Sequence, residues 1–425
     1  MKNLVVSICL FGSIALFNPL SFADTLVTNL DEDIEEEQNH KSWLAAPGIY
    51  YSEYLDVAIG AGAYFKGFRQ EQESFFVSAY TSQSGSRGLW LYSYQTQLLD
   101  RLFVDSSYHW GWRHDVKTFR QGNPNFSDEV AGSNDSSDDN FIESTGEDTY
   151  LNFKFYYVLP WGDGEEGGIH DYKVSKGRLV EATASGGRLF NPQLSGRFFI
   201  GSELFAQRQL FSDKYDIGYD GHTTGARIFA QYDNRDWRDE PSKGSNHILT
   251  FSRDAGILDS TSTWSKVELD MTKYWSLGSS NWAKNRVLAF NFYTADVPTW
   301  GNDERPPEFE LPSLGGVDRL RAYPFRRYIS RSAIYYGLEH RYTLMTNPIN
   351  LIPLPDFIPD FDLQVATFAE LGRVNDAYDF KELNKDMQWS AGVGLRANLL
   401  GSIGRMDIAT SDHSWAWYLS AAYPW

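Results

Sequence analysis

The sequence predicts an all-β fold, a transmembrane antiparallel β-barrel of about sixteen strands with one long loop folded into the lumen. Segments of about ten residues alternate apolar and polar side chains, as strands do when they face lipid on one side and water on the other. Aromatic residues make up 16% of the chain, including 25 tyrosines and 14 tryptophans, as expected for girdles at two membrane interfaces. Beyond the N-terminus no apolar run is long enough for a spanning helix, which excludes a helical membrane protein.

Residues 1–23 have the features of a secretory signal peptide. Lys2 supplies the positive start, Leu4 to Phe17 the apolar run, and Ser21-Phe22-Ala23 the small-x-small cleavage site. An N-terminal membrane anchor is the alternative, but the apolar run is short for a span and ends at Asn18-Pro19. We therefore expect an exported protein whose mature chain begins at Asp24.

The expected mature chain is acidic and has no thiol. Removal of Lys2 with the signal changes the formal net charge from −18 to −19, which argues against a nucleic-acid partner. The only cysteine, Cys9, lies in the signal, so disulfides are excluded. Residues 24–46 are expected to be an acidic periplasmic segment, with Asp31 to Glu37 solvated; a docking motif and a lumen plug are the alternatives. Residues 47–425 are expected to form the barrel, with no room before it for a folded periplasmic domain.

The strands follow one another by their alternation. In the first, Val57 and Ile59 are expected to face lipid, and Gly60 and Gly62 to face the lumen. Charged residues alternate with apolar ones over 265–272, which predicts a wet interior. The remaining candidates, one of them weaker near Arg178 to Leu189, are Phe75–Thr81, Gly88–Leu98, Leu102–Trp112, Thr149–Leu159, Arg197–Leu210, Gly225–Tyr232, His247–Arg253, Ser265–Tyr274, Val287–Thr294, Ala333–Leu344, Leu363–Gly372, Trp389–Asn398, Ile403–Thr410 and Trp415–Trp425.

The last of these strands ends the chain. Trp415 to Trp425 alternates throughout, and the chain stops on an aromatic residue. This ending resembles the C-terminal signal that the assembly machinery of bacterial outer-membrane barrels reads. The terminal strand of a secreted β-sandwich is the alternative. Gln121 to Asp148 is rich in Ser, Asp, Asn and Gly, and is expected to be a long extracellular loop.

The stretch from Leu311 to Arg341 carries the strongest functional signal. It contains, in order, a turn at Gly315-Gly316, a tip with Arg321 and Tyr323, and a strand with Glu339 and Arg341. A long loop of this kind can fold back into the lumen of a barrel.

A carboxylate on another strand could hold such a loop. The alternation of Leu363–Gly372 directs Phe368 and Glu370 to the lumen. A bidentate pair between Arg321 and Glu370 would be directional enough to lock the loop inside.

The order and spacing of four segments match the sequence pattern of one protein family. They are the hairpin from Tyr232 to Asp236, with Asp233, Arg235 and Asp236 followed by Pro241 and Gly244; the loop and strand from Gly315 to Arg341; Phe368 to Gly372; and Ser390 to Arg396 with Gly401 and Gly404. Together they resemble the bacterial outer-membrane assembly-factor superfamily that includes BamA and TamA, also called the bacterial surface-antigen family. Pro47 to Gly67 is similar to the family's first strand.

The resemblance implies that Arg321 pairs with Glu370, with Phe368 and Tyr323 beside the tip. A purely structural brace is the alternative. Arg326 and Arg327 are secondary lumen candidates. The chain departs from the family in having Ala322 in place of a glycine and Glu370 in place of an aspartate. Because Ala322 resists a positive φ and Glu370 reaches one methylene further, we expect a displaced or loosened lock.

A second feature is the junction between first and last strands. Gly60 and Gly62 weaken the predicted first strand, and Pro424, next to Trp425, removes a ladder donor from the last. Few hydrogen bonds would then close the barrel. The resemblance implies a lateral gate here, which thins the membrane and templates incoming strands; ordinary barrel taper is the alternative.

Enzymatic signals are weak. None of the eight histidines lies in a metal motif or beside a serine nucleophile on one strand face, and no phosphate loop appears. We expect a non-enzymatic outer-membrane protein without cofactor or metal, which assists insertion or translocation of proteins or lipids. Its expected partners are outer-membrane lipid, unfolded outer-membrane proteins or lipids as clients, and the barrel-assembly machinery for its own insertion. A passive channel or surface structural barrel, and an outer-membrane hydrolase, are the alternatives.

Overall fold

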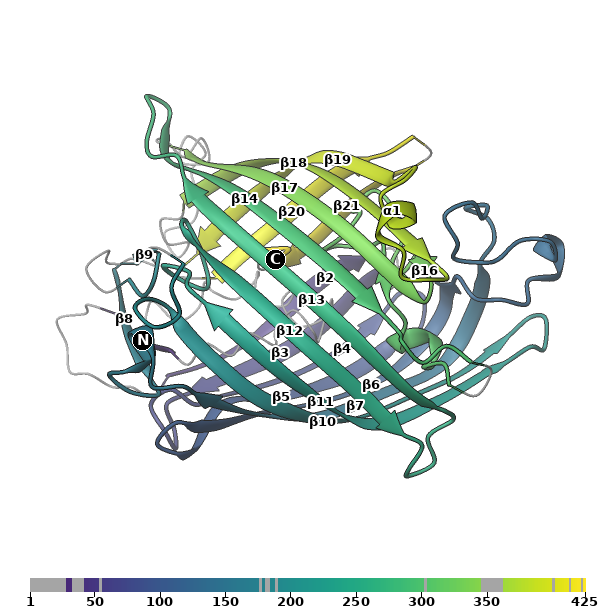
Figure 1. The fold of residues 1–425 in the computed structure, drawn as a ribbon, viewed down its shortest axis with the longest axis horizontal. Coiled ribbons are helices and arrows are strands. Elements are labelled where there is room, and N and C mark those ends of the chain that lie inside the picture. The colour runs from purple at the N-terminus through teal and green to yellow at the C-terminus, as the bar shows by residue number, and fades with distance from the viewer. Residues whose placement is uncertain are drawn as a thin grey trace.

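The computed structural model describes residues 28–32, 42–52, 56–175, 178–179, 184–187, 190–301, 304–344, 362–399, 402–412, 414–421 and 423–425. The expected signal peptide lies outside the described residues. Sixteen antiparallel strands form one continuous sheet that curls into a barrel (Figure 1). In the described part of the chain, no helix is long and apolar enough to cross a membrane.

The sheet follows the order of the chain, with each strand paired to the next one. The sixteen strands are β2 (Ser42–Ser52), β3 (Asp56–Lys66), β4 (Ser74–Ser82), β5 (Arg87–Leu99), β6 (Leu102–Thr118), β7 (Ile142–Val158), β10 (Arg197–Asp213), β11 (Tyr219–Asp233), β12 (Gly244–Ala255), β13 (Thr263–Ser276), β14 (Ala283–Asp296), β17 (Ser332–Leu344), β18 (Asp362–Asn375), β19 (Gln388–Leu399), β20 (Ser402–Thr410) and β21 (Trp415–Ala421).

Burial alternates along these strands as the pattern predicts for a barrel with a polar interior. On β11, Arg227 and Gln231 are buried inside, whereas Ile228 between them is 59% exposed on the outer face. Exposed aromatic residues lie near the strand ends at both rims, as in the interfacial girdles of membrane proteins: Trp43, Tyr157, Trp275 and Trp282 at one rim, and Trp112 and Trp415 at the other.

The two ends of the barrel differ. At one end, called here the N-terminal end, lie the connections 67–73, 100–101, 159–196, 234–243 and 277–282. At the other, called the loop end, lie 83–86, 119–141, 214–218, 256–262, 297–331 and 376–387, which includes the short helix α1 (Phe380–Leu383). Figure 1 shows β8 at the N-terminal end and α1 at the loop end.

A small second sheet stands at the N-terminal end. In it, β1 (Thr28–Glu32) pairs in parallel with β8 (His170–Ser175), which pairs with β9 (Arg178–Leu179). Tyr172 of β8 is fully buried in an aromatic cluster with Phe103, Tyr156, Phe199, Phe229 and Trp237. Part of the acidic segment therefore forms a strand, since β1 includes Asp31 and Glu32, and the rest of the segment expected to be solvated, residues 33–37, lies outside the described residues.

Three sequence-based boundaries need correction. The barrel begins at Ser42 with β2 and not at residue 47, so the predicted first strand is the second, β3. Pro47 and Gly48 hide β2 in the sequence, and an edge strand tolerates such a proline. The weaker candidate near 178–189 is not a barrel strand; only β9 forms there. β7 begins at Ile142, so the long loop ends before that residue and not at Asp148.

The end of the chain also differs from the prediction. β21 stops at Ala421 and does not continue to Trp425. Tyr423 lies 3.9 Å from the guanidinium carbon of Arg341, and Trp425 donates a hydrogen bond through Nε1 to the hydroxyl of Tyr335 at 3.2 Å. Because Arg341 and Tyr335 face the lumen, the last residues turn inward. Pro424 cannot donate to a ladder, which favours this departure from the strand.

Candidate functional site

The loop 297–331 forms a tight hairpin inside the barrel. Its short strands β15 (Ser313–Leu314) and β16 (Tyr328–Ile329) pair with each other. Gly315 and Gly316 follow with φ of 111° and 106°, and a Cβ on Gly315 would lie 2.2 Å from the carbonyl oxygen of Pro324. Only glycine fits this turn without strain. The turn sends the following residues, including Arg321, to the barrel wall.

Arg321 is fully buried and contacts three carboxylates from three strands. Its Nε lies 2.9 Å from Oε1 of Glu370 on β18. Its Nη1 lies 2.9 Å from both Oε2 of Glu339 on β17 and Oδ2 of Asp407 on β20. Its guanidinium also lies 3.4 Å from the ring centre of Phe368. One loop side chain therefore fixes the loop to three strands at once.

Glu370 receives the loop backbone as well as its side chain. The amide of Arg321 donates to Oε2 of Glu370 at 2.7 Å. The hydroxyl of Tyr335 donates to Oε1 at 2.8 Å, and the hydroxyl of Ser390 donates to Oε2. A carboxylate with this many donors is well satisfied despite its burial.

The other two carboxylates belong to a larger ion-pair network. Glu339 pairs with Arg341 at 2.8 Å and with Arg396 at 3.2 Å. Asp407 pairs with Arg396 and lies 3.6 Å from Arg405. Arg405 in turn donates to the carbonyl oxygen of Val317, in the loop, at 2.8 Å.

Sequence reasoning found Arg321, Glu370, Glu339 and Arg341 but did not select Asp407 or Arg405. Both charged residues are two apart in the candidate strand Ile403–Thr410, which places them on one face. That pattern was the available signal for a further lumen contact.

The structure accommodates both departures from the family pattern, Ala322 and Glu370. The left-handed backbone falls at Leu320, with φ of 52°, and Ala322 does not need it. Ala322 is buried, and its carbonyl oxygen accepts a hydrogen bond from the hydroxyl of Ser414 at 2.6 Å. The longer side chain of Glu370 still reaches Arg321. The expectation of a loosened lock is therefore wrong for the contact itself.

Tyr323 joins the loop to the end of the sheet. Its hydroxyl donates to Oε1 of Gln388 at 3.3 Å, and its carbonyl oxygen accepts from the hydroxyl of Tyr418 on β21 at 3.0 Å. The secondary candidate Arg327 points elsewhere, to Asp138 at 2.8 Å in the loop 119–141.

The loop 119–141 also binds the wall. Asn134 accepts from the amide of Val374 at 3.1 Å and donates to the carbonyl oxygen of that residue at 2.6 Å. The amide of Ile329 donates to the carbonyl oxygen of Gly132 at 2.8 Å. The loop 119–141 therefore covers the inward-folded loop at the loop end.

A second anchor holds the start of the loop 297–331 on another part of the wall, at β11 and β13. Glu310, in a 3₁₀ turn at Glu308–Glu310, pairs with Arg227 of β11 and, at 3.0 Å, with Lys266 of β13. Burial alone would raise the pKa of Glu310, but the two cations outweigh it and lower the pKa to about 2. The loop thus spans the lumen from β11 and β13 to β17, β18 and β20.

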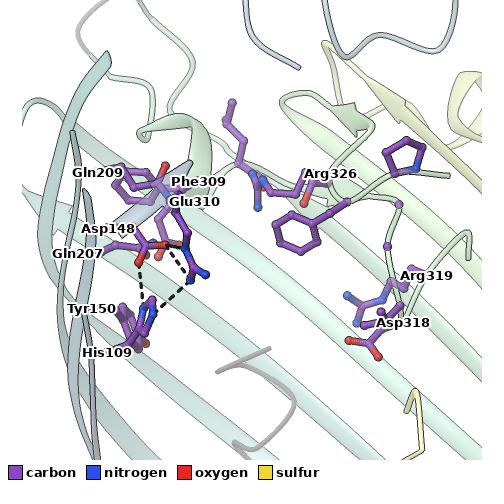
Figure 2. A pocket seen from close by; sticks show the side chains of 18 of the residues that line it. His109, Asp148, Tyr150, Gln207, Gln209, Phe309, Glu310, Asp318, Arg319 and Arg326 are labelled. Carbon is purple, nitrogen blue, oxygen red and sulfur yellow. Dashed lines mark hydrogen bonds and ion pairs between the residues drawn. The ribbon is translucent and has the colours of Figure 1, made fainter. Parts of the chain in front are cut away.

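A cavity of about 280 Å³ remains between the loop and the wall. Figure 2 shows Glu310 and Phe309 of the loop beside Tyr150 and Gln207 of the wall, with His109 near Asp148. Nδ1 of His109 lies 3.0 Å from Oδ1 of Asp148. Charged and aromatic side chains from both the loop and the wall therefore line this cavity.

The predicted junction lies elsewhere than expected. Gly60 and Gly62 belong to β3 and pair on both sides, with Gly48 and Ala46 of β2 and with β4. The edges of the sheet are β2 and β21, which approach each other. Over the residues described for these two strands, no hydrogen-bonded ladder joins them. Pro424 and Trp425 follow β21, with Trp425 turned inward.

The hairpin motif is built as a self-contained turn. Arg235 donates through Nε to Oδ1 of Asp233 at 3.0 Å, and Asp236 accepts from the amide of Ser242 at 2.9 Å. Gly244 has φ of 104°, and a Cβ there would lie 1.8 Å from the carbonyl oxygen of Asn234. The motif therefore closes the connection between β11 and β12.

The fold and the loop define a class of protein: a transmembrane β-barrel of sixteen strands that holds one of its own loops inside through buried ion pairs. A family model described as the Omp85 superfamily domain matches residues 92–409. The chain belongs to the Omp85 superfamily, whose barrels reside in the bacterial outer membrane. The comparison with curated proteins finds no match.

Two solved structures share the fold at low sequence identity, and a third is similar at a lower TM-score. CdiB from Escherichia coli is 12% identical with a TM-score of 0.58, over 91% of this chain and 64% of that one. CdiB from Acinetobacter baumannii is 10% identical with a TM-score of 0.53, over 90% and 59%. BamA from Haemophilus ducreyi lacking POTRA domains 1–3 is 11% identical with a TM-score of 0.49, over 91% and 70%. The chain thus spans less than two thirds of either CdiB chain.

Proposed function

We propose that this chain is a non-enzymatic outer-membrane protein that assists the insertion or translocation of other proteins, or of lipids, at that membrane. Membership in the Omp85 superfamily supports the general role. The observation that carries the proposal is the position of the loop tip, which is fixed to the barrel wall and also touches β21, an edge of the sheet.

The loop tip supports the C-terminal edge directly. Ala322 and Tyr323 accept hydrogen bonds from Ser414, just before β21, and from Tyr418 within it. The same tip is fixed by Arg321 to β17, β18 and β20. The edge strand is therefore held from inside the barrel and does not depend only on its ladder with β20.

An edge strand held in this way can receive another strand. Extended segments add to a sheet edge through main-chain hydrogen bonds, and this is the pairing that the proposal assigns to β21. In the proposal, an unfolded barrel protein pairs with the β2 or β21 edge, and the junction between them opens. The N-terminal end then faces the periplasm, where clients arrive, and the loop end faces outward.

The inward-turned tail is consistent with this opening. Because β21 stops at Ala421 and Tyr423 and Trp425 pack inside, little of the chain after Ala421 is available for pairing with β2. A short last strand leaves a weaker junction.

Site-specific photocrosslinking tests the proposal. A photoreactive residue is placed at Trp417, on the outer face of β21, and at Phe251, on the outer face of β12; these are 37% and 40% exposed. The protein is reconstituted in phospholipid vesicles, and a urea-unfolded eight-stranded barrel is added. We expect adducts and faster client folding with crosslinks concentrated at Trp417. Equal crosslinking at both positions, or no acceleration over empty vesicles, would contradict the proposal.

A passive channel is the second candidate, because a cavity of about 280 Å³ lined by charged and aromatic side chains remains in the lumen. The anchors at Glu310 and Arg321 keep the loop across that lumen, which argues against a wide open pore. Planar-bilayer conductance distinguishes the two functions. A large basal conductance in the wild-type protein would favour the channel, whereas low conductance that rises in Arg321→Ala fits a barrel closed by its loop.

A further inference from the structure

The segment of residues 190–196, called here the strap, lies on the outer face of the barrel at the N-terminal end. Phe190 packs edge-on against the rings of Tyr232 and His247, at centroid distances of 4.9 and 5.4 Å. Both rings are on outward positions, because Arg227 and Gln231 of β11 and Ser252 of β12 point inward on the opposite parity. The strap therefore crosses the rim and covers lipid-facing positions.

Burial supports the same placement. Tyr232 is only 4% exposed, although Ile228, on the same outer face of β11, is 59% exposed. The hydroxyl of Tyr232 donates to the carbonyl oxygen of Ser195 at 2.8 Å, within the strap. The strap is thus the cover that removes Tyr232 from the surface.

The strap is held in a fixed position. The hydroxyl of Ser195 donates to Oδ1 of Asn234, in the hairpin after β11, at 2.9 Å. Oδ2 of Asp163 accepts from the amides of Gly186, which precedes the strap, and Gly196, the last residue of the strap, at 2.7 and 2.8 Å. The same Asp163 oxygen accepts from the hydroxyl of Ser185 at 3.0 Å. Asn234 of the hairpin and Asp163 therefore hold the strap in place, and neither residue takes part in the loop site.

The strap exposes apolar side chains where it is held. Phe190 is 61% exposed and Leu194 is 73% exposed. Trp161 is 47% exposed and packs against Phe198, an outward residue of β10, at 5.9 Å. The amide of Gly162, next to Trp161, donates to the carbonyl oxygen of Gln193 at 3.2 Å, which joins the two segments. A fixed group of exposed apolar residues marks an interaction surface.

We propose that the strap and Trp161 form an interfacial membrane anchor, with Phe190 and Leu194 in the headgroup–acyl boundary of the leaflet at the N-terminal end. The partner is lipid and not protein, because the patch is continuous with the outward band of β10 to β12 and lies at the level of the aromatic girdle at this rim. The anchor sets the depth of this wall in the bilayer, and it does not depend on the function proposed above.

The chain is well suited to a direct test. Cys9 is the only cysteine, so expression without residues 1–23 gives a cysteine-free protein for single spin labels. Leu194→Cys is labelled in vesicles of phosphatidylcholine and phosphatidylglycerol, and power saturation compares accessibility to oxygen and to a water-soluble nickel chelate. Ile228→Cys serves as the lipid reference. Leu258→Cys, 76% exposed in the 256–262 turn at the loop end, serves as the water reference.

We expect the ratio of oxygen to nickel accessibility at Leu194 to exceed that at Leu258 several-fold and to approach that at Ile228. A ratio equal to that at Leu258 would overturn the anchor. Exposed labels leave the buried contacts of the strap intact, and heat-modifiable migration on gels confirms that each labelled barrel is folded. A second measurement uses Phe190→Trp, whose emission should shift to the blue when the folded protein passes from detergent to vesicles, relative to the unsubstituted protein; an unchanged difference spectrum also counts against the anchor.

Discussion

Replacement of Arg321 by alanine should destabilise the barrel far more than a typical lumen substitution. Glu339 would keep Arg341 at 2.8 Å and Arg396 at 3.2 Å, and Asp407 would keep Arg396. Glu370 would lose its ion pair and keep only uncharged donors, which are the backbone amide of residue 321 and the hydroxyls of Tyr335 and Ser390. One buried carboxylate is thus left without a cation, and breaking a buried pair in this way costs about 3–5 kcal/mol.

The partner substitution should cost less. In Glu370→Ala, Arg321 retains Glu339 and Asp407 at 2.9 Å each, so no buried charge is left alone, and we expect a loss of about 1–3 kcal/mol. The double variant removes both the cation and the carboxylate that needs it. Its destabilisation should fall below the sum of the single values by about 2–3 kcal/mol.

Urea unfolding in vesicles, followed by tryptophan fluorescence, measures all four proteins, and heat-modifiable gel migration provides an independent scale. Outer-membrane integrity in a deletion strain then shows whether the lock matters for function. If the two single losses are equal and add in the double variant, Glu370 is not the carboxylate that depends on Arg321, and the reasoning from the contacts fails. If a variant loses outer-membrane integrity without a matching loss of stability, the loop has a role beyond bracing the barrel.

Three further predictions concern the turns and the second anchor. Gly244→Ala should lower the free energy of unfolding by about 2–4 kcal/mol, because its Cβ would meet the carbonyl oxygen of Asn234 at 1.8 Å. Gly278→Ala is the matched control, since Gly278 has φ of 68° and open space around it, and it should lower the same quantity by only about 1 kcal/mol in the same urea titration. Glu310→Gln should lower the stability by about 1–2 kcal/mol and increase proteolysis of the loop 297–331, and unchanged cleavage would rule out the second anchor. Burial raises the pKa of Glu308 to about 7, so its contribution to loop docking is fully present below its ordinary pKa of 4.5 and is lost as the pH rises through about 7. The protection of loop amides, which is the intrinsic base-catalysed exchange rate divided by their observed rate at the same pH, should therefore be lower at pH 8 than at pH 5, and Glu308→Gln should remove most of this difference in protection.

Most of the barrel could be predicted from the chain because alternation of period two is a direct consequence of a wall with lipid on one side and water on the other. Fifteen of the sixteen strands were found in this way. β2 was missed as a separate strand because Pro47 and Gly48 interrupt the pattern, and an edge strand has less need of a regular ladder. The candidate near residues 178–189 shows the converse error, since its local pattern does not reveal that the connection leaves the barrel.

The sequence predicted those parts of the site that depend only on the type of a residue and on the face of one strand. Arg321 and Glu370 followed from the glycine turn and from the parity of β18. The contacts of Asp407 and Glu310 depend on where the loop lies relative to β11, β13 and β20 in the folded barrel. The pattern within a single strand does not contain this information. The inward turn of Trp425 likewise depends on tertiary contacts, which Trp425 makes with Tyr335 and Arg341.

The inward turn of residues 423–425 separates two uses of Trp425 in time. Trp425 cannot lie against Tyr335 and be read by an assembly factor at the same time. If its terminal aromatic residue serves as an assembly signal, the tail must be released before it enters the lumen, so its entry is a late step of folding. Tags are better placed in the 256–262 turn, where Ile257 and Leu258 are exposed, than beside Trp425 and its contact with Tyr335.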